Sequence, residues 1–234
     1  MAARLYLIPN LLSAENIHKS IPLYNQEIIR NLKHFIVENP KPARHLLKAA
    51  GVKTPFEDIY FYEFNEHTRE SELSDIIKPL IDGNDMGLIS DAGYPAIADP
   101  GEKIVKIAQQ KHFKVVPLSG PSSIFMTLAA SGLNAEQFSF HAYLPIKKPD
   151  RIKQILELEA ISFKTGYSQI FIEAPYRSQY LFEDIISCCK SETVLSIAVE
   201  LMSEHEFIQS KSISQWKKSK LDLKNKRVVF VIGS

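Results

Sequence analysis

The chain has 234 residues, of which 45% are hydrophobic and 24% are charged, and its formal net charge at pH 7 is +1. This composition is typical of a globular protein with room for one large or two small domains. It excludes a membrane-spanning helix, and it gives no strong electrostatic field toward nucleic acid.

The cysteines and histidines bear on location and metal binding. Cys188 and Cys189 are adjacent and are not expected to bridge each other, and no secretion signal precedes the first strand pattern. Both features favour a cytoplasmic protein. No paired His/Cys spacing indicates a zinc site, so we expect no metal.

Strand and helix patterns alternate in the first half of the chain. The strand patterns are Arg4–Ile8, His34–Val37, Asp58–Phe64, Met86–Ile89 and Lys114–Leu118. The helix patterns between them are Pro22–Leu32, Pro42–Ala50, Thr68–Asp82 and Glu102–Lys111. This alternation predicts a mainly parallel sheet covered by helices on both faces.

The second half has a different order. The expected helices are Ser123–Ala130, Asp150–Ile161 and Ser178–Cys189, and the expected strands are Phe138–Tyr143, Gln169–Ile172, Val194–Val199, His205–Ser210 and Arg227–Ile232. The short break within residues 194–210 favours an antiparallel hairpin, and therefore a mixed sheet. We place a boundary near Pro117–Pro121 and predict an α/β domain at 1–118 and a second α/β domain at 119–234.

The run Gly87–Gly101 is the most informative part of the sequence. Its last eleven residues hold two acids, two glycines and two prolines, and they directly follow an apolar strand. Loops in this position bind ligands in open α/β sheets, although a well-made turn is the simpler alternative. We expect Asp99 to cap the next helix and Pro100 to occupy its first position. Neither a G-x-G-x-x-G fingerprint nor a Walker A loop is present.

Three shorter motifs also lie at expected element ends. Ser119–Ser123 opens a helix, where free backbone N–H groups attract an anion unless a serine merely caps the helix. Glu173 and Arg177 flank a proline after a strand and orient a polar substrate, or else form a surface salt bridge. Glu200 ends another apolar strand. A basic cluster near the C-terminus could meet RNA phosphates or could simply be solvated: Lys217, Lys218, Lys220, Lys224, Lys226 and Arg227.

These motifs follow one another in a fixed order between Leu5 and Gly233. They read Ser90-Asp-Ala-Gly-Tyr-Pro-Ala-Ile-Ala-Asp-Pro-Gly101, Pro117-Leu-Ser-Gly-Pro-Ser-Ser123, Ala142-Tyr-Leu-Pro145, Glu173-Ala-Pro-Tyr-Arg177 and Val199-Glu-Leu201. The chain thereby resembles the tetrapyrrole methylase superfamily of S-adenosylmethionine (SAM)-dependent methyltransferases. Within it, the chain is most similar to bacterial ribosomal RNA ribose 2′-O-methyltransferases that act on a small-subunit cytidine.

The resemblance implies two α/β domains with SAM in the cleft between them, a homodimer, and ribosomal RNA or the small ribosomal subunit as substrate. It implies methyl transfer to a ribose 2′-hydroxyl. By motif position, the residues expected to bind SAM are Pro9, Ser90, Asp91, Ala92, Ile97, Ser122, Ser123, Glu173, Ala174, Glu200 and Leu201. Those expected on the substrate side are Arg44, Asn65, Tyr143 and Arg177. Glu38 is our candidate general base.

The chain departs from the family pattern mainly on the substrate side. Pro9-Asn10-Leu11 lacks the glycine of the usual Gly-Asn pair, and Glu200-Leu201-Met202-Ser203 lacks the usual lysine. The usual Glu-Asp-Thr-Arg motif is stretched to Glu38…Arg44. Two alternatives therefore stay open: methylation of a tetrapyrrole or other small molecule, and SAM binding without catalysis.

Overall fold

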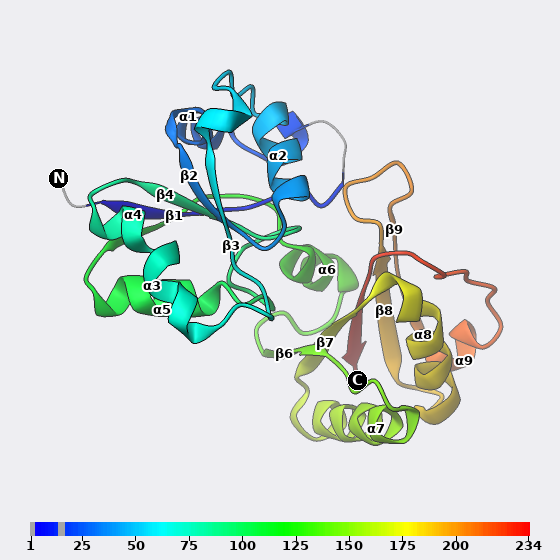
Figure 1. Cartoon of the computed structure of the whole chain (residues 1–234). Coiled ribbons are helices and arrows are strands. Elements are labelled where there is room, and N and C mark those ends of the chain that lie inside the picture. The colour runs from blue at the N-terminus through cyan, green and yellow to red at the C-terminus, as the bar shows by residue number, and fades with distance from the viewer. Residues whose placement is uncertain (1–2, 14–16) are drawn as a thin grey trace. The chain divides into compact units, whose positions relative to one another are not determined.

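The computed structural model describes residues 3–13 and 17–234. The chain divides into two compact units, Met1–Ser122 and Ser123–Ser234, here called the N-terminal and C-terminal units (Figure 1).

The N-terminal unit is built on a five-stranded sheet whose strands all run parallel. Its order is β3-β2-β4-β1-β5. The strands are β1 (Arg4–Ile8), β2 (His34–Val37), β3 (Tyr60–Glu63), β4 (Met86–Ile89) and β5 (Lys114–Pro117). The helices are α1 (Leu23–Asn31), α2 (Pro40–Ala49), α3 (Leu73–Ile76), α4 (Lys78–Ile81) and α5 (Glu102–Gln110), and the 3-10 turns are η1 (Ile17–Lys19), η2 (Phe56–Asp58) and η3 (Glu70–Glu72). The parallel sheet expected from the alternation is confirmed.

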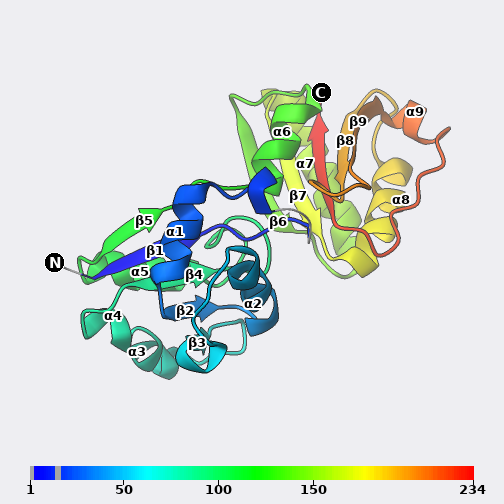
Figure 2. The ribbon, with the colours of Figure 1, turned by 90° about the horizontal axis from the view of Figure 1, so that it is seen from above.

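Apolar side chains cover both faces of this sheet. In β1, Tyr6 and Ile8 pack in one cluster with α1 and α2, whereas Leu5 and Leu7 pack in another with α3, α4 and α5. Figures 1 and 2 show these two groups of helices on the two sides of the sheet. Successive strand residues point to opposite faces, so a short strand covered on both sides must be apolar throughout.

The strand order decides where the loops of this unit meet. In the register, Ile8 of β1 lies beside Ile89 of β4, and Ile89 lies beside Val37 of β2. The segments that follow these three parallel strands therefore leave the sheet at one edge. This edge is where open α/β sheets bind their ligands.

Some element boundaries differ from the expected ones. β3 starts at Tyr60 rather than Asp58, because Phe56–Asp58 forms a 3-10 turn. The single helix expected over Thr68–Asp82 is instead η3, α3 and α4, with a break at Ile77. Pro79 lies in the first turn of α4, and its missing N–H is tolerated only at a helix start.

The C-terminal unit has a mixed five-stranded sheet of order β6-β7-β10-β8-β9. Its strands are β6 (Phe138–Tyr143), β7 (Ser168–Glu173), β8 (Val194–Val199), β9 (Phe207–Ser212) and β10 (Val228–Gly233). Its helices are α6 (Ser123–Ser131), α7 (Lys148–Thr165), α8 (Ser178–Cys188) and α9 (Ile213–Trp216), with a 3-10 turn η4 (Pro175–Arg177). β6 and β7 are parallel, whereas β8 and β9 form an antiparallel pair, so the expected hairpin and mixed sheet are confirmed.

Helices cover both faces of this second sheet as well. Side chains of α7, α8 and α9 share a cluster with Phe171 and Phe230, and those of α6 share another with Ile170 and Val231. Within residues 3–13 and 17–234, no helix is long and apolar enough to cross a membrane. Over the same residues, His, Cys, Asp and Glu side chains form no group of three or more that could hold a metal ion.

Candidate functional site

The candidate site of the N-terminal unit is the segment after β4, residues 90–101, here called the strand-end loop. Asn10, the second residue after β1, anchors it. The buried Asn10 amide donates from Nδ2 to the carbonyl oxygens of Ser90 (2.8 Å) and Asp91 (3.2 Å). Its Oδ1 accepts from the N–H of Leu11 at 2.8 Å. One side chain thus ties the ends of two neighbouring strands together.

Backbone pairing strengthens the same connection. The N–H of Asn10 donates to the carbonyl of Gly93 at 2.8 Å, and the N–H of Gly93 donates back to Asn10 at 3.2 Å. Gly93 has a φ of +71°, and a Cβ there would lie 3.3 Å from the side chain of Leu12. The buried Ser90 hydroxyl donates to the carbonyls of Ala92 and Gly93 at 3.2 and 3.4 Å. The loop is therefore held from its first residue onward.

The second part of the loop is backbone under strain. Ala96 and Ala98 have φ values of +64° and +61°, which L-residues seldom adopt without a compensating interaction. Asp99 supplies one, since its carboxylate accepts from the N–H of Ala96 (2.9 Å) and of Gly101 (2.7 Å). Asp99 is not the N-cap that we expected. α5 starts at Glu102 with Gly101 as its N-cap residue, so Asp99 and Pro100 shape the loop before the helix.

Two carboxylates lie together where β2 and β4 end. The N–H of Asp91 lies 3.4 Å from Oε2 of Glu38. Burial raises the pKa of Glu38 above its ordinary value, and the negative charge of Asp91 raises it further, as do Asp99 and Glu66. Partial desolvation also raises the pKa of the Asp91 carboxyl, although the residue is exposed. Glu38 and Asp91 therefore form a partly desolvated cluster of negative charge, where binding of a cation would be favourable.

The segment after β5 packs closely against the residue that follows β1. A Cβ built on Gly120, after β5, would lie 2.4 Å from Cβ of Pro9, closer than carbon atoms can pack. Glycine is thus required at position 120 while Pro9 stays at the end of β1. The carbonyl of neighbouring Ser119 accepts from Nδ2 of Asn25 at 2.5 Å. The segments after β1 and β5 therefore pack against each other.

The structure brings five of the predicted SAM residues to this edge: Pro9, Ser90, Asp91, Ala92 and Ile97 follow β1 or β4. Pro9 and Ser90 are buried, whereas Asp91, Ala92 and Ile97 are exposed. Glu38 joins them from the end of β2. Sequence reasoning missed Asn10 as a site residue, although a polar residue directly after an apolar strand was a visible signal.

Two substrate-side candidates of this unit have local partners. The guanidinium of Arg44, on α2, lies 5.3 Å from the ring centroid of Phe61. Asn65 closes a turn after β3: its Oδ1 accepts from the N–H of His67 at 3.0 Å, and its own N–H donates to Thr68. Their contact with a substrate remains a prediction.

In the C-terminal unit, Glu173 and Arg177 form a buried pair rather than the surface salt bridge considered above. Nη2 of Arg177 donates to Oε2 of Glu173 at 2.5 Å and to the carbonyl of Leu144 at 3.2 Å. The other oxygen of Glu173 accepts from the N–H of Ala174 at 2.7 Å. Both oxygens of this carboxylate are therefore occupied by the protein. A cofactor that binds at Glu173–Ala174 would therefore contact backbone groups rather than this carboxylate. That contact remains a prediction.

Glu200 is also held by the protein. Its carboxylate accepts from the backbone N–H of Arg227 (2.6 Å) and from the guanidinium of the same residue (2.5 and 3.1 Å). Burial alone would raise the pKa of Glu200, but the hydrogen bonds and charge of Arg227 outweigh it and lower the pKa. Glu200 has a φ of +46°, and Leu201 beside it is buried. Ser122 ends one unit and Ser123 begins α6 of the other.

Comparison with known proteins identifies relatives. No family model matches the chain. Three curated relatives are named ribosomal RNA small subunit methyltransferase I. That of Vibrio cholerae is 29% identical over 189 residues, which are 81% of this chain and 62% of the relative. That of Synechocystis is 30% identical over 77% of this chain and 61% of the relative's length. That of Halalkalibacterium halodurans is 32% identical over 76% of this chain and 59% of the relative's length. The chain thus matches less than two thirds of their length.

The fold has a solved counterpart. The crystal structure of the methyltransferase CobJ superposes with a TM-score of 0.65 and covers 100% of this chain and 95% of its own, at 12% sequence identity. The chain is thus similar in sequence to proteins named ribosomal RNA small subunit methyltransferase I, and it has the fold of a solved methyltransferase.

Proposed function

We propose that this chain is a SAM-dependent methyltransferase that acts on a ribose 2′-hydroxyl of ribosomal RNA. The observation that carries the proposal is the anchored strand-end loop, which holds the exposed Asp91 carboxylate beside Glu38 where parallel strands end. The relatives' names support the substrate class. The same proposal includes a homodimer and a cytoplasmic location, where ribosomal subunits are found.

The chemistry of the loop fits SAM. When bound, SAM supplies a methyl group activated by a positively charged sulfur, and it also carries an ammonium group. Asp91 and Glu38 offer negative charge in a partly desolvated place, where an ionic contact is stronger than in bulk water. Backbone groups of residues 90–97 are held in place by Asn10 and Asp99, so little order would have to be gained on binding.

Glu38 is our proposed general base. A ribose hydroxyl must lose its proton when it is methylated, and a positioned base accelerates such a step by about 10²–10⁴-fold. The raised pKa of Glu38 makes its carboxylate a stronger base than an ordinary one. Most of the acceleration would still come from holding the two reactants in line.

SAM binding is tested by isothermal titration calorimetry on Asp91→Asn. We expect affinity to fall about 10- to 150-fold, since a charge-assisted contact contributes about 1.5–3 kcal/mol. Asp75→Asn is the matched control, because Asp75 is an exposed carboxylate on α3 of the same unit. Equal affinity of Asp91→Asn and the unmutated protein would show that the loop is only a turn.

The acceptor is tested with labelled SAM and small ribosomal subunits from a strain that lacks the enzyme. We expect label in one ribose, and we expect Glu38→Gln to lower turnover while SAM affinity changes less. Label on a tetrapyrrole and none on RNA would favour the small-molecule alternative. Tight SAM binding with no transfer to any acceptor would favour the non-catalytic one.

A further inference from the structure

An unusual loop follows β6 in the C-terminal unit. The pairing of β6 with β7 shifts register between Phe140 and Tyr143, and Ala142 within this bulge has a φ of +50°. A β-bulge redirects the side chains that follow it, and a positive φ at alanine costs free energy. The strain is located directly before the exposed Tyr143.

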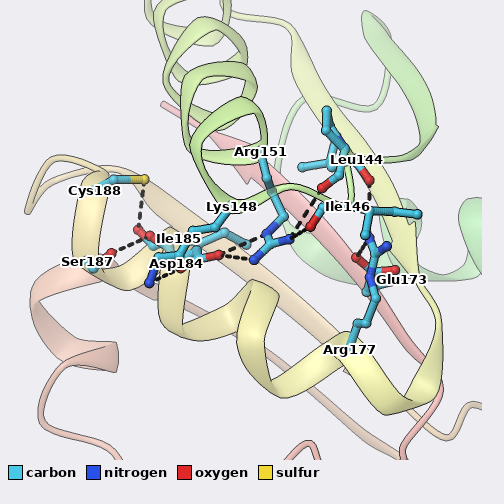
Figure 3. Close-up of polar contacts among 11 residues, drawn as sticks. Leu144, Ile146, Lys148, Arg151, Glu173, Arg177, Asp184, Ile185, Ser187 and Cys188 are labelled. Carbon is cyan, nitrogen blue, oxygen red and sulfur yellow. Dashed lines mark hydrogen bonds and ion pairs between the residues drawn. The ribbon is translucent and has the colours of Figure 1, made fainter.

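Two arginines, the buried Arg151 and the mostly buried Arg177, hold the carbonyl oxygens of three successive residues of this loop (Figure 3). Arg177 donates to Leu144 at 3.2 Å. Nη1 of Arg151 donates to Ile146 at 2.7 Å and to Pro145 at 3.3 Å. These bonds leave the loop with little freedom to rearrange.

Each arginine is itself held by a buried acid. Arg151 and Asp184 are 7% and 3% exposed, and Nε and Nη2 of the arginine lie 2.8 and 2.5 Å from Oδ2 of the acid. Arg177 has the corresponding partner in Glu173. Burying two ion pairs is costly in desolvation and adds little net stability. Their evident result is a rigid surface loop.

The rigid loop presents apolar groups to solvent. Tyr143 is 55% exposed and Ile146 is 76% exposed. Two more rings follow nearby: Tyr176 in the turn η4 is 67% exposed, and Tyr180 in the first turn of α8 is 63% exposed. The hydrogen bond from Arg177 to Leu144 brings this turn to the loop, since each tyrosine is near in sequence to one of the bonded residues. Singly exposed tyrosines are ordinary, but several of them on segments tied together by hydrogen bonds indicate an interaction surface.

A basic segment is docked beside the same turn. The hydroxyl of Ser178 donates to the carbonyl of Lys226 at 3.0 Å, and the N–H of Leu223 donates to Gln179 at 2.8 Å. Lys224 lies between these two contacts and is exposed. Asp222, the nearby acid, accepts from the N–H of Lys224. Part of the C-terminal basic cluster is thus fixed next to Tyr176 and Tyr180.

We propose that Tyr143, Ile146, Tyr176 and Tyr180, here called the tyrosine platform, stack on unpaired nucleotides of RNA while Lys224 contacts phosphate. This inference rests on the proposed function, because it identifies where the RNA substrate is held. Rigid aromatic rings beside lysines suit single strands, whose bases are free to stack. A duplex hides its base faces and offers only its backbone and groove edges.

The test is fluorescence anisotropy of the full chain with a short fluorescein-labelled oligouridylate, in the absence of SAM. We expect the double variant Tyr176→Ala/Tyr180→Ala to bind about 5- to 150-fold more weakly, the range for loss of base–aromatic stacking. Tyr176→Phe/Tyr180→Phe keeps both rings and should bind like the unmutated protein. Tyr24→Ala is the matched control, because Tyr24 on α1 is similarly exposed. Lys224→Ala should reduce the slope of log affinity against log salt concentration by about 1, as expected for the loss of one phosphate contact.

Equal affinities of the alanine pair and the unmutated protein would overturn the inference. A changed elution volume in size-exclusion chromatography with unchanged RNA affinity would also overturn it, since the rings would then join two copies of the chain. Failure of the proposed function is recognised separately. RNA binding through the tyrosines without methyl transfer contradicts only that function, whereas methyl transfer with unaltered affinity in the alanine pair contradicts only the platform.

Discussion

Replacing Asn10 by alanine should destabilise the N-terminal unit by about 1.5–4.5 kcal/mol. The substitution removes the two bonds from Nδ2 to Ser90 and Asp91 and the bond from Leu11 to Oδ1. Each such hydrogen bond contributes a net of about 0.5–1.5 kcal/mol, and the groups left behind are mostly buried. Because the strand-end loop loses its anchor, SAM affinity should fall about tenfold or more.

Urea unfolding followed by two signals separates the units. Trp216, the only tryptophan, lies buried in the C-terminal unit, so its fluorescence reports on that unit. Far-ultraviolet circular dichroism reports on both. We expect Asn10→Ala to lower the midpoint of the dichroism transition assigned to the N-terminal unit and to leave the tryptophan transition in place. Calorimetry with SAM gives the affinity.

Asn39→Ala is the matched control. Asn39 caps α2 through one bond, from the N–H of Lys41 to its Oδ1 at 3.0 Å, and it is exposed. Its loss should cost about 0.5–2 kcal/mol and leave SAM affinity unchanged. The reasoning is refuted if Asn10→Ala costs less than about 1.5 kcal/mol, or if it binds SAM like the unmutated protein.

Three further predictions follow from other contacts. Gly120→Ala should cost at least about 1–3 kcal/mol in urea unfolding, because its Cβ would overlap the ring of Pro9; an unchanged midpoint would contradict this contact. Arg151→Met should cost at most about 3–5 kcal/mol, whereas Arg151→Met/Asp184→Leu should cost much less, since the single variant leaves the buried Asp184 carboxylate with only the exposed Lys148 as its ionic partner; similar losses in both would be inconsistent with this. The pKa of Glu38 is raised in the folded state, so its contribution to the free energy of unfolding is largest below its ordinary pKa and is lost as pH rises through the raised one. Glu38→Gln should reduce that pH dependence, measured by urea unfolding at a series of pH values, and an unaltered slope would count against the raised pKa.

Local patterns made most of the secondary structure predictable. β1, β2 and β4 have the expected bounds, because apolar runs end at polar or turn-forming residues that can be read directly from the chain. The helix expected over Thr68–Asp82 was wrong as one piece, because its apolar spacing continues through Pro79 while its hydrogen bonds do not. Periodicity describes which face is buried, and it does not record whether each N–H has a partner.

The order of strand and helix patterns and of the motifs by itself predicted the fold class and the likeness to methyltransferases, since both depend on short segments in sequence order. Only the tertiary structure decided what each polar side chain does. Asn10 reaches residues 80 and 81 positions away, and Arg151 reaches Asp184 across 33. Glu173 and Glu200, which looked available to a ligand, are occupied by Arg177 and Arg227. The distant partners are decided by strand order and helix packing, so no local pattern in the sequence reveals them; the spacing of Glu173 and Arg177 suggested their pairing but not its burial.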